Sequence, residues 1–158
     1  MVRYTAGVVN SVNPEDVMPL MIDVGVFNNA KANTNYGNIT VGASYLHNAY
    51  KQGAGAQNQA CSWDVVLARG TWTCKLIHTK GTDQGIYSVQ IDGVTEGTID
   101  GYTGSTTYNQ VSSVTGIVIP SERTVQLQLK MATKNASSSN YHGNLDGVQL
   151  VRVSTAIV

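Results

Sequence analysis

Charged residues are scarce in this sequence. Lysine and arginine together number 10, aspartate and glutamate also number 10, and the charged fraction is 13%, about half the usual share for a soluble domain. The formal net charge of zero argues against a nucleic-acid partner and against a polybasic membrane contact, because both need an excess of Lys and Arg. The surface is therefore expected to consist largely of Asn, Gln, Ser, Thr and Gly.

Long apolar segments are also missing. No apolar run approaches the roughly 20 residues that cross a bilayer, and residues 1–16 lack the continuous apolar stretch of a secretory signal. We therefore interpret the two glycosylation sequons, at Asn38 and Asn135, as chance matches. The 158 residues are enough for one well-buried core and too few for two.

Cysteine occurs at only two positions, Cys61 and Cys74. Two thiols are too few for a structural zinc site, which takes four ligands. The spacing permits a disulfide across a short hairpin. The alternative, which we favour, is that both are reduced and behave as small buried apolar residues; the sequence leaves the choice open.

Catalytic motifs are not found. The sequence contains no G-x-S-x-G elbow and no Walker-type or dinucleotide motif. The spacing of the three histidines fits no metal site, and His78 falls on the apolar face of a predicted strand, where we interpret it as a hydrogen-bonded core or rim residue. We therefore predict a protein that is not an enzyme, with no catalytic residue, no bound metal and no cofactor.

Four aspartates fall at or near predicted turns or strand ends: Asp83, Asp92, Asp100 and Asp146. We interpret them as turn residues, because an aspartate side chain accepts hydrogen bonds from neighbouring backbone N–H groups. Two weaker interpretations remain open, a pair of carboxylates for glycoside hydrolysis and oxygen ligands for calcium. No spacing selects particular ligands for such an ion.

The sequence does contain strongly alternating apolar and polar residues, which is typical of β-strands with one buried face. Tyr87, Val89 and Ile91 alternate with polar residues and lead into Asp92-Gly93, the strongest turn signal of the chain. The strands that we predict from Trp63 onward are residues 63–68, 71–78, 86–92, 94–99, 111–119, 123–131 and 146–153. Seven or eight strands separated by turns indicate an all-β fold, an antiparallel β-sandwich of jelly-roll type. Trp63 and Trp72 are expected in its core.

The first part of the chain differs in character. Asn13 and Pro14 indicate a short helical turn that Pro19 ends, and an apolar strand is expected at residues 21–27. We interpret residues 1–27 as an attachment segment and residues 28–158 as the sandwich domain. Within the asparagine-rich residues 28–60 we expect a strand at 39–46 and an ordered, uncharged loop at 51–60.

Residues 70–109 (GTWTCKLIHTKGTDQGIYSVQIDGVTEGTIDGYTGSTTYN) and 123–153 (RTVQLQLKMATKNASSSNYHGNLDGVQLVRV) carry a resemblance to known proteins. They resemble a jelly-roll module of phage structural proteins, including head decorations and fibre or tail-spike ends. They are also similar to galactose-binding-like sandwiches that serve as carbohydrate-binding modules. The resemblance is strongest over residues 61–153, and its turns supply most of the shared features.

The phage resemblance implies a non-catalytic virion accessory protein, a head decoration or fibre protein that binds the capsid or another virion protein through residues 1–27. It would form a homotrimer and reside in the virion after assembly in the host cytoplasm. The alternative is a carbohydrate-binding or host-receptor-binding module of a phage tail. Its candidate ligand-binding residues lie in two polar loops, since sugars stack on aromatic rings and hydrogen-bond to amides: Tyr102, Tyr108, Asn109, Asn140 and Tyr141. The competing interpretation is that these tyrosines fasten the loops or fill an intersubunit contact.

Overall fold

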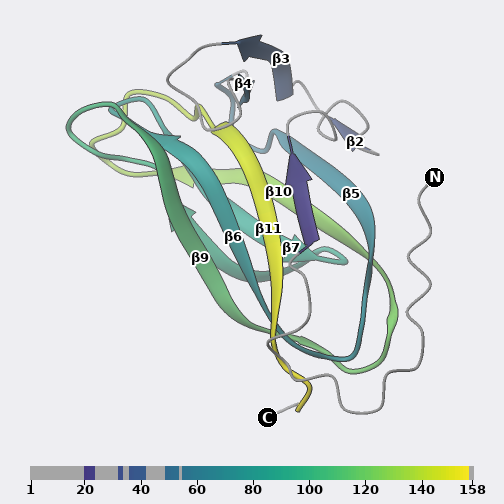
Figure 1. Cartoon of the computed structure of the whole chain (residues 1–158). Coiled ribbons are helices and arrows are strands. Elements are labelled where there is room, and N and C mark those ends of the chain that lie inside the picture. Colours follow the sequence, from purple (N-terminus) through teal and green to yellow (C-terminus); the bar gives the residue numbers. More distant parts are fainter. Residues whose placement is uncertain (1–19, 24–31, 34–35, 42–48, 54, 157–158) are drawn as a thin grey trace.

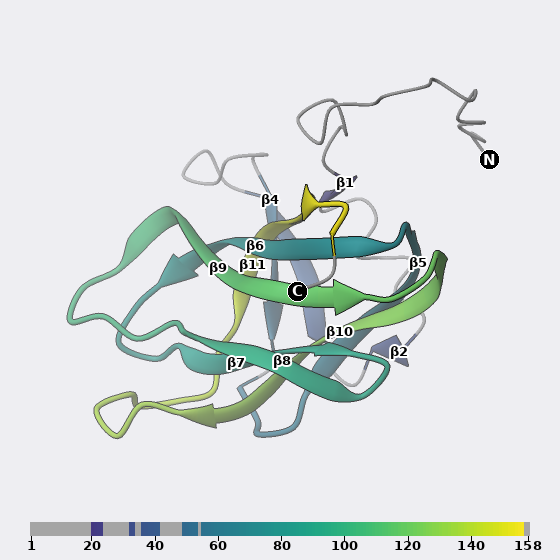
Figure 2. The same ribbon diagram turned by 90° about the horizontal axis from the view of Figure 1, so that it is seen from below.

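The computed structural model describes residues 20–23, 32–33, 36–41, 49–53 and 55–156. These residues form two antiparallel sheets packed face to face (Figures 1 and 2). The strands in chain order are β1 (Leu20–Asp23), β2 (Ala32–Asn33), β3 (Tyr36–Val41), β4 (Ala49–Gly53), β5 (Ala60–Leu67), β6 (Gly70–Lys80), β7 (Gly85–Ile91), β8 (Val94–Asp100), β9 (Thr107–Ile119), β10 (Arg123–Lys134) and β11 (Asn144–Ser154). The described residues include no helix long and apolar enough to cross a membrane.

The order of the strands gives the jelly-roll connectivity. Sheet A runs β3-β4-β11-β6-β9, with β1 also paired to β11, and sheet B runs β2-β5-β10-β7-β8. From β4 onward the chain changes sheet at every connection except the β7–β8 hairpin. Every pairing between named strands is antiparallel. The predicted fold class, an all-β jelly-roll sandwich, is confirmed.

The core lies between the two sheets and follows the alternation of the sequence. In β10 the residues Val125, Leu127, Leu129 and Met131 are all buried, while the residues between them are partly exposed. Burying one such side chain contributes about 1.5–3 kcal/mol, so this face of β10 is a main stabilising element. Both tryptophans are buried as predicted, and Trp72 Nε1 donates a hydrogen bond to the Ala68 carbonyl.

The predicted hairpin between β7 and β8 is also confirmed. Asp92 has φ 49° and Gly93 has φ 81°, so both central residues occupy the left-handed region that a two-residue hairpin turn requires. Tyr87, Val89 and Ile91 are buried on one face of β7.

Three sequence predictions need correction. The described residues contain eleven strands rather than seven or eight. Each strand that we predicted from Trp63 onward begins earlier or ends later in the structure, by a few residues. Residues 51–53 are part of β4 and not of a loop. Their local sequence favours a loop, but pairing to β11, with Leu145 opposite Lys51 and Asn144 opposite Gln52, overrides that preference.

Little of the predicted attachment segment falls in the described ranges. Residues 20–23 form β1, which pairs with β11 from Leu20 opposite Leu150 to Asp23 opposite Gly147, so this part belongs to sheet A. The expected helical turn at residues 13–19 and most of the expected strand at 21–27 lie outside the described residues. The attachment role stays a prediction.

Candidate functional site

Loops from four parts of the chain meet at one end of the sandwich. They are residues 55–59 before β5, residues 81–84 between β6 and β7, residues 101–106 between β8 and β9, and residues 135–143 between β10 and β11. Parallel bridges join Gly81 to Tyr102 and Gln84 to His142. The β6–β7 turn therefore lies at the centre of this end of the sandwich, between the 101–106 loop on one side and the 135–143 loop on the other.

The 135–143 loop is held against the β6–β7 turn by backbone hydrogen bonds. The Ser139 N–H donates to the Thr82 carbonyl at 2.9 Å, the His142 N–H donates to Asp83 at 3.0 Å, and the Gly85 N–H donates to His142 at 2.7 Å. The buried Ser138 hydroxyl adds a hydrogen bond to the Gln84 carbonyl at 2.8 Å. These contacts fix the backbone of both segments and so fix the directions of their side chains.

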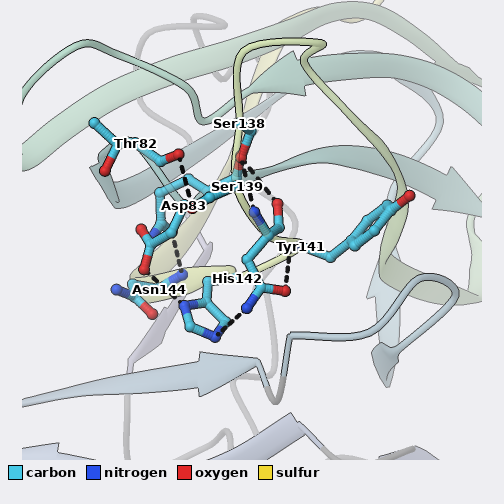
Figure 3. A network of polar contacts seen from close by, with 9 residues as sticks. Thr82, Asp83, Ser138, Ser139, Tyr141, His142 and Asn144 are labelled. Carbon is cyan, nitrogen blue, oxygen red and sulfur yellow. Dashed lines mark hydrogen bonds and ion pairs between the residues drawn. The ribbon is translucent and has the colours of Figure 1, made fainter.

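Asp83 and His142 form the centre of the site (Figure 3). His142 Nδ1 lies 2.8 Å from Asp83 Oδ2, and the two side chains are 22% and 42% exposed. The other carboxylate oxygen, Asp83 Oδ1, accepts a hydrogen bond from Gln84 Nε2 at 2.8 Å. Burial alone would raise the pKa of Asp83, but the hydrogen bonds from Gln84 and His142 outweigh it and hold that pKa below its ordinary value. Asp83 is accordingly a carboxylate at neutral pH.

Asn140 determines which nitrogen of His142 carries the proton. The Tyr141 N–H donates to Asn140 Oδ1 at 2.8 Å, so the amide nitrogen Nδ2 faces His142 Nε2 at 3.3 Å. Because an amide nitrogen can only donate, Nε2 is the acceptor and Nδ1 carries the hydrogen that is donated to Asp83. Asn140 thus donates to His142 and His142 donates to Asp83, which makes a directed chain of hydrogen bonds that ends at the carboxylate, and Gln84 donates to the same carboxylate from the other side.

Gly55 packs closely against the side chains of His142 and Asn140. A Cβ atom placed on Gly55 would lie 2.8 Å from both Cδ2 and Nε2 of His142, and Gly55 has φ +86°. Only glycine combines that backbone conformation with so close a contact. The imidazole ring is therefore held on one side by the backbone of the loop that precedes β5.

Asp100 links the 101–106 loop to the 135–143 loop. Its Oδ1 accepts from the Tyr102 N–H at 2.8 Å, and its Oδ2 accepts from Asn135 Nδ2 at 2.8 Å. Both carboxylate oxygens thus serve local structure, which agrees with the interpretation of Asp100 as a turn residue.

The five predicted ligand-binding residues are distributed unequally. Tyr102, Asn140 and Tyr141 lie in the loops that meet at the β6–β7 turn, and all three are partly exposed. Lys134 Nζ lies 5.3 Å from the centroid of the Tyr141 ring, within the range of a cation–π contact. Tyr108 and Asn109 are not loop residues, because β9 begins at Thr107.

Sequence analysis missed the pair at the centre of the site. Asp83 was interpreted as a turn residue, and His142 was given no role. The one available signal was the position of His142 directly after Tyr141 in a predicted binding loop. Of the remaining predictions, His78 is a buried, hydrogen-bonded core residue as expected, with Nε2 3.0 Å from Ser112 Oγ.

Within the described ranges, no group of three or more His, Cys, Asp or Glu side chains is placed to hold a metal ion. The chemistry that the site offers is hydrogen bonding. Each Asp83 oxygen has a further lone pair, and Asn140 Nδ2 has a second hydrogen. The exposed Ser139 hydroxyl of the same loop donates to the Thr82 carbonyl at 3.3 Å and can still accept a hydrogen bond.

Comparison with solved structures gives the same fold in carbohydrate-active proteins. The chain is similar to part of a xanthan lyase from Paenibacillus, with 22% identity and a TM-score of 0.71 over 85% of this chain and 13% of the lyase. It is also similar to a family 35 carbohydrate-binding module from an environmental isolate, with 18% identity and a TM-score of 0.59 over 83% of this chain and 91% of the module.

A third similar structure is the carbohydrate-binding module CBM36 in complex with calcium and xylotriose, with 13% identity and a TM-score of 0.57 over 83% of this chain and 98% of that module. No protein-family model matches the sequence, and no curated protein matches it. These likenesses show the fold of the chain, a jelly-roll sandwich. The chain spans only a small part of the lyase and nearly all of the two modules.

Proposed function

We propose that this protein is a non-catalytic glycan-binding module and that its site is the loop end of the sandwich around Asp83, Asn140 and His142. The observation that carries the proposal is the directed hydrogen-bond chain through these side chains, which leaves donors and acceptors at a partly exposed surface. A sugar offers adjacent hydroxyl groups that both donate and accept, so it needs such mixed partners in fixed positions.

The aromatic component of the site would come from Tyr141 and Tyr102, which lie on either side of the β6–β7 turn. An aromatic ring stacks on the apolar face of a sugar while amides and carboxylates bind its edge. The resemblance to carbohydrate-binding modules supports the same conclusion at the level of the fold.

The composition of the site also favours binding over hydrolysis. The common routes of glycoside hydrolysis need two carboxyl groups on opposite sides of the scissile bond. Asp83 is the one carboxylate in the hydrogen-bond chain, while both oxygens of Asp100 are engaged by Tyr102 and Asn135.

The proposal is tested on a glycan array followed by isothermal titration calorimetry on the strongest hit. We expect Asp83→Asn to weaken binding by about tenfold or more, since removing a hydrogen bond to a charged group costs about 1.5–3 kcal/mol. Tyr141→Ala should also weaken binding, because it removes the ring that stacks on the sugar. Asp92→Asn is the matched control, because Asp92 also accepts a side-chain hydrogen bond, from Arg123, but lies at the opposite end of β7. A wild type that binds no glycan, or an Asp83→Asn variant that binds as tightly as Asp92→Asn, contradicts the proposal.

The virion location, the capsid partner and the homotrimer stay predictions. The three similar structures described above are an enzyme and two carbohydrate-binding modules, and none of the three is a virion protein. A glycan-binding module at a phage tail would be compatible with both interpretations of the sequence.

A further inference from the structure

Strand β9 forms a long and uncharged edge of sheet A. It spans 13 residues, and in the part of the chain that the structure describes its one strand neighbour is β6. Figure 1 shows β9 as the outermost ribbon on its side of the molecule. The sequence TYNQVSSVTGIVI contains no Lys, Arg, Asp, Glu or Pro.

Such an edge is unusual because natural sheets protect their edges from pairing with other chains. The common protections are charged side chains, proline, short strands and bulges. The edge of sheet B shows them: β8 has seven residues, carries Glu96 and ends at Asp100, and its pairing to β7 is interrupted between Val89 and Gln90. Of these protections, β9 has only the bulges.

The bulges leave a regular segment in the middle of β9. Its pairing with β6 is unbroken from Gln110 opposite His78 to Val114 opposite Cys74, with register shifts on either side. Val114 is buried and Ser112 Oγ contacts the buried His78, so Val111 and Ser113 lie on the outer face. Val111 is 62% exposed.

We propose that this segment of β9 pairs antiparallel with β9 of a second copy of the chain and joins the two A sheets into one. The absence of charge favours a second copy as occupant, because any charged residue near a two-fold axis would lie close to its own symmetry mate. The formal net charge of zero also removes long-range repulsion between copies. With the axis at Ser112, the centre of the regular segment, each Val111 lies opposite Ser113 of the second copy.

The pairing has a consequence for the proposed glycan sites, and this consequence rests on the proposed function. β9 begins next to the loop end, after the 101–106 loop. In an antiparallel pair the two loop ends therefore lie at opposite ends of the dimer. Such a dimer would bridge two glycan chains and would not bind one chain twice from the same side.

The test is sedimentation velocity on the full chain over a wide range of concentrations, with no glycan present. We expect the wild type to shift from monomer to dimer as concentration rises and Val111→Lys to stay monomeric. Val94→Lys is the matched control: it makes the same change at a β8 residue that is 63% exposed, and it should dimerise like the wild type. Circular dichroism checks that both variants are folded.

Charge complementarity then tests the register. Ser113→Glu should also be monomeric. It should not destabilise the fold, because Glu at this position lies opposite Lys75 on β6. An equimolar mixture of Val111→Lys and Ser113→Glu should recover dimers, because Lys and Glu then lie opposite each other across the interface. A wild type that is monomeric at every concentration, a trimer, or a dimer unaffected by Val111→Lys overturns the proposal. Failure of glycan binding alone does not affect it.

Discussion

Asp83 Oδ2 and His142 Nδ1 lie 2.8 Å apart although 59 positions separate the two residues in the sequence. The contact joins the β6–β7 turn to the loop between β10 and β11. It exists because the two segments run side by side, linked by three backbone hydrogen bonds. The pairing of the loops thus comes first, and the side-chain chemistry of the proposed glycan site depends on it.

Replacing Gly55 by alanine should disturb this site without removing any of its polar atoms. The new methyl group would lie 2.8 Å from the His142 ring, and the positive φ of Gly55 strains any L-residue. We expect a loss of stability of about 1–2 kcal/mol and weaker glycan binding. Chemical denaturation and calorimetry measure the two effects.

Gly104→Ala provides the matched control for Gly55→Ala. Gly104 lies in the 101–106 loop at the same end of the sandwich, and an added Cβ there would meet no atom within 4 Å. We expect its stability and glycan binding to equal those of the wild type. Equal behaviour of the two alanine variants would show that the contact between Gly55 and His142 is unimportant.

The sequence predicts the sandwich well where burial alternates strictly. The buried rows of β7 and β10, the β7–β8 turn and the two core tryptophans all follow from local pattern, because one face of each strand is covered and the other is wet. β4 was missed because its residues form a strand only through pairing with β3 and β11, which no local pattern indicates. Asp83 and His142 were missed for the same reason, since no local pattern records which loops become neighbours.

The two thiols should be unreactive in the native protein. Cys61 and Cys74 are both buried and form no disulfide with each other, and burial raises the pKa of Cys74 to about 12, so the nucleophilic thiolate of Cys74 is not formed at neutral pH. We expect no labelling by a thiol reagent until the protein is unfolded, and then labelling of both cysteines. An intact mass lower by two hydrogens under non-reducing conditions would instead identify a disulfide.

The β7–β8 turn should tolerate asparagine better than alanine at position 92. Asp92 has φ 49°, and its Oδ1 accepts a hydrogen bond from the Gln126 N–H at 2.8 Å. Asn keeps both features and loses only the ion pair with the exposed Arg123, which we expect to cost under about 1 kcal/mol. Ala loses the hydrogen bond and is strained at positive φ, so we expect a further cost of about 1–2 kcal/mol. Urea unfolding of both variants checks the order, and equal stabilities would contradict it.

The buried His78 should make the protein less stable in mild acid. Burial, reinforced by the charge of Lys80, lowers the pKa of His78 from 6.5 to about 4, so the ring stays neutral in the folded state. The unfolded chain binds a proton at this residue below pH 6.5, whereas the folded chain does not bind it until about pH 4. The unfolded state therefore holds more protons within this window, and the free energy of unfolding decreases as pH falls through it.

The total effect of His78 amounts to at most about 3.5 kcal/mol, from a pKa that falls from 6.5 to about 4 and about 1.4 kcal/mol for each unit of pKa difference. The measurement is urea unfolding of the wild type and His78→Gln at several pH values between 7 and 4.5. We expect the variant to be less stable at pH 7, because it loses the edge contact with Tyr87 at a ring distance of 5.6 Å. Its stability should nevertheless decrease less steeply toward acid, since glutamine does not titrate. Two parallel stability curves would show that His78 is not the group responsible.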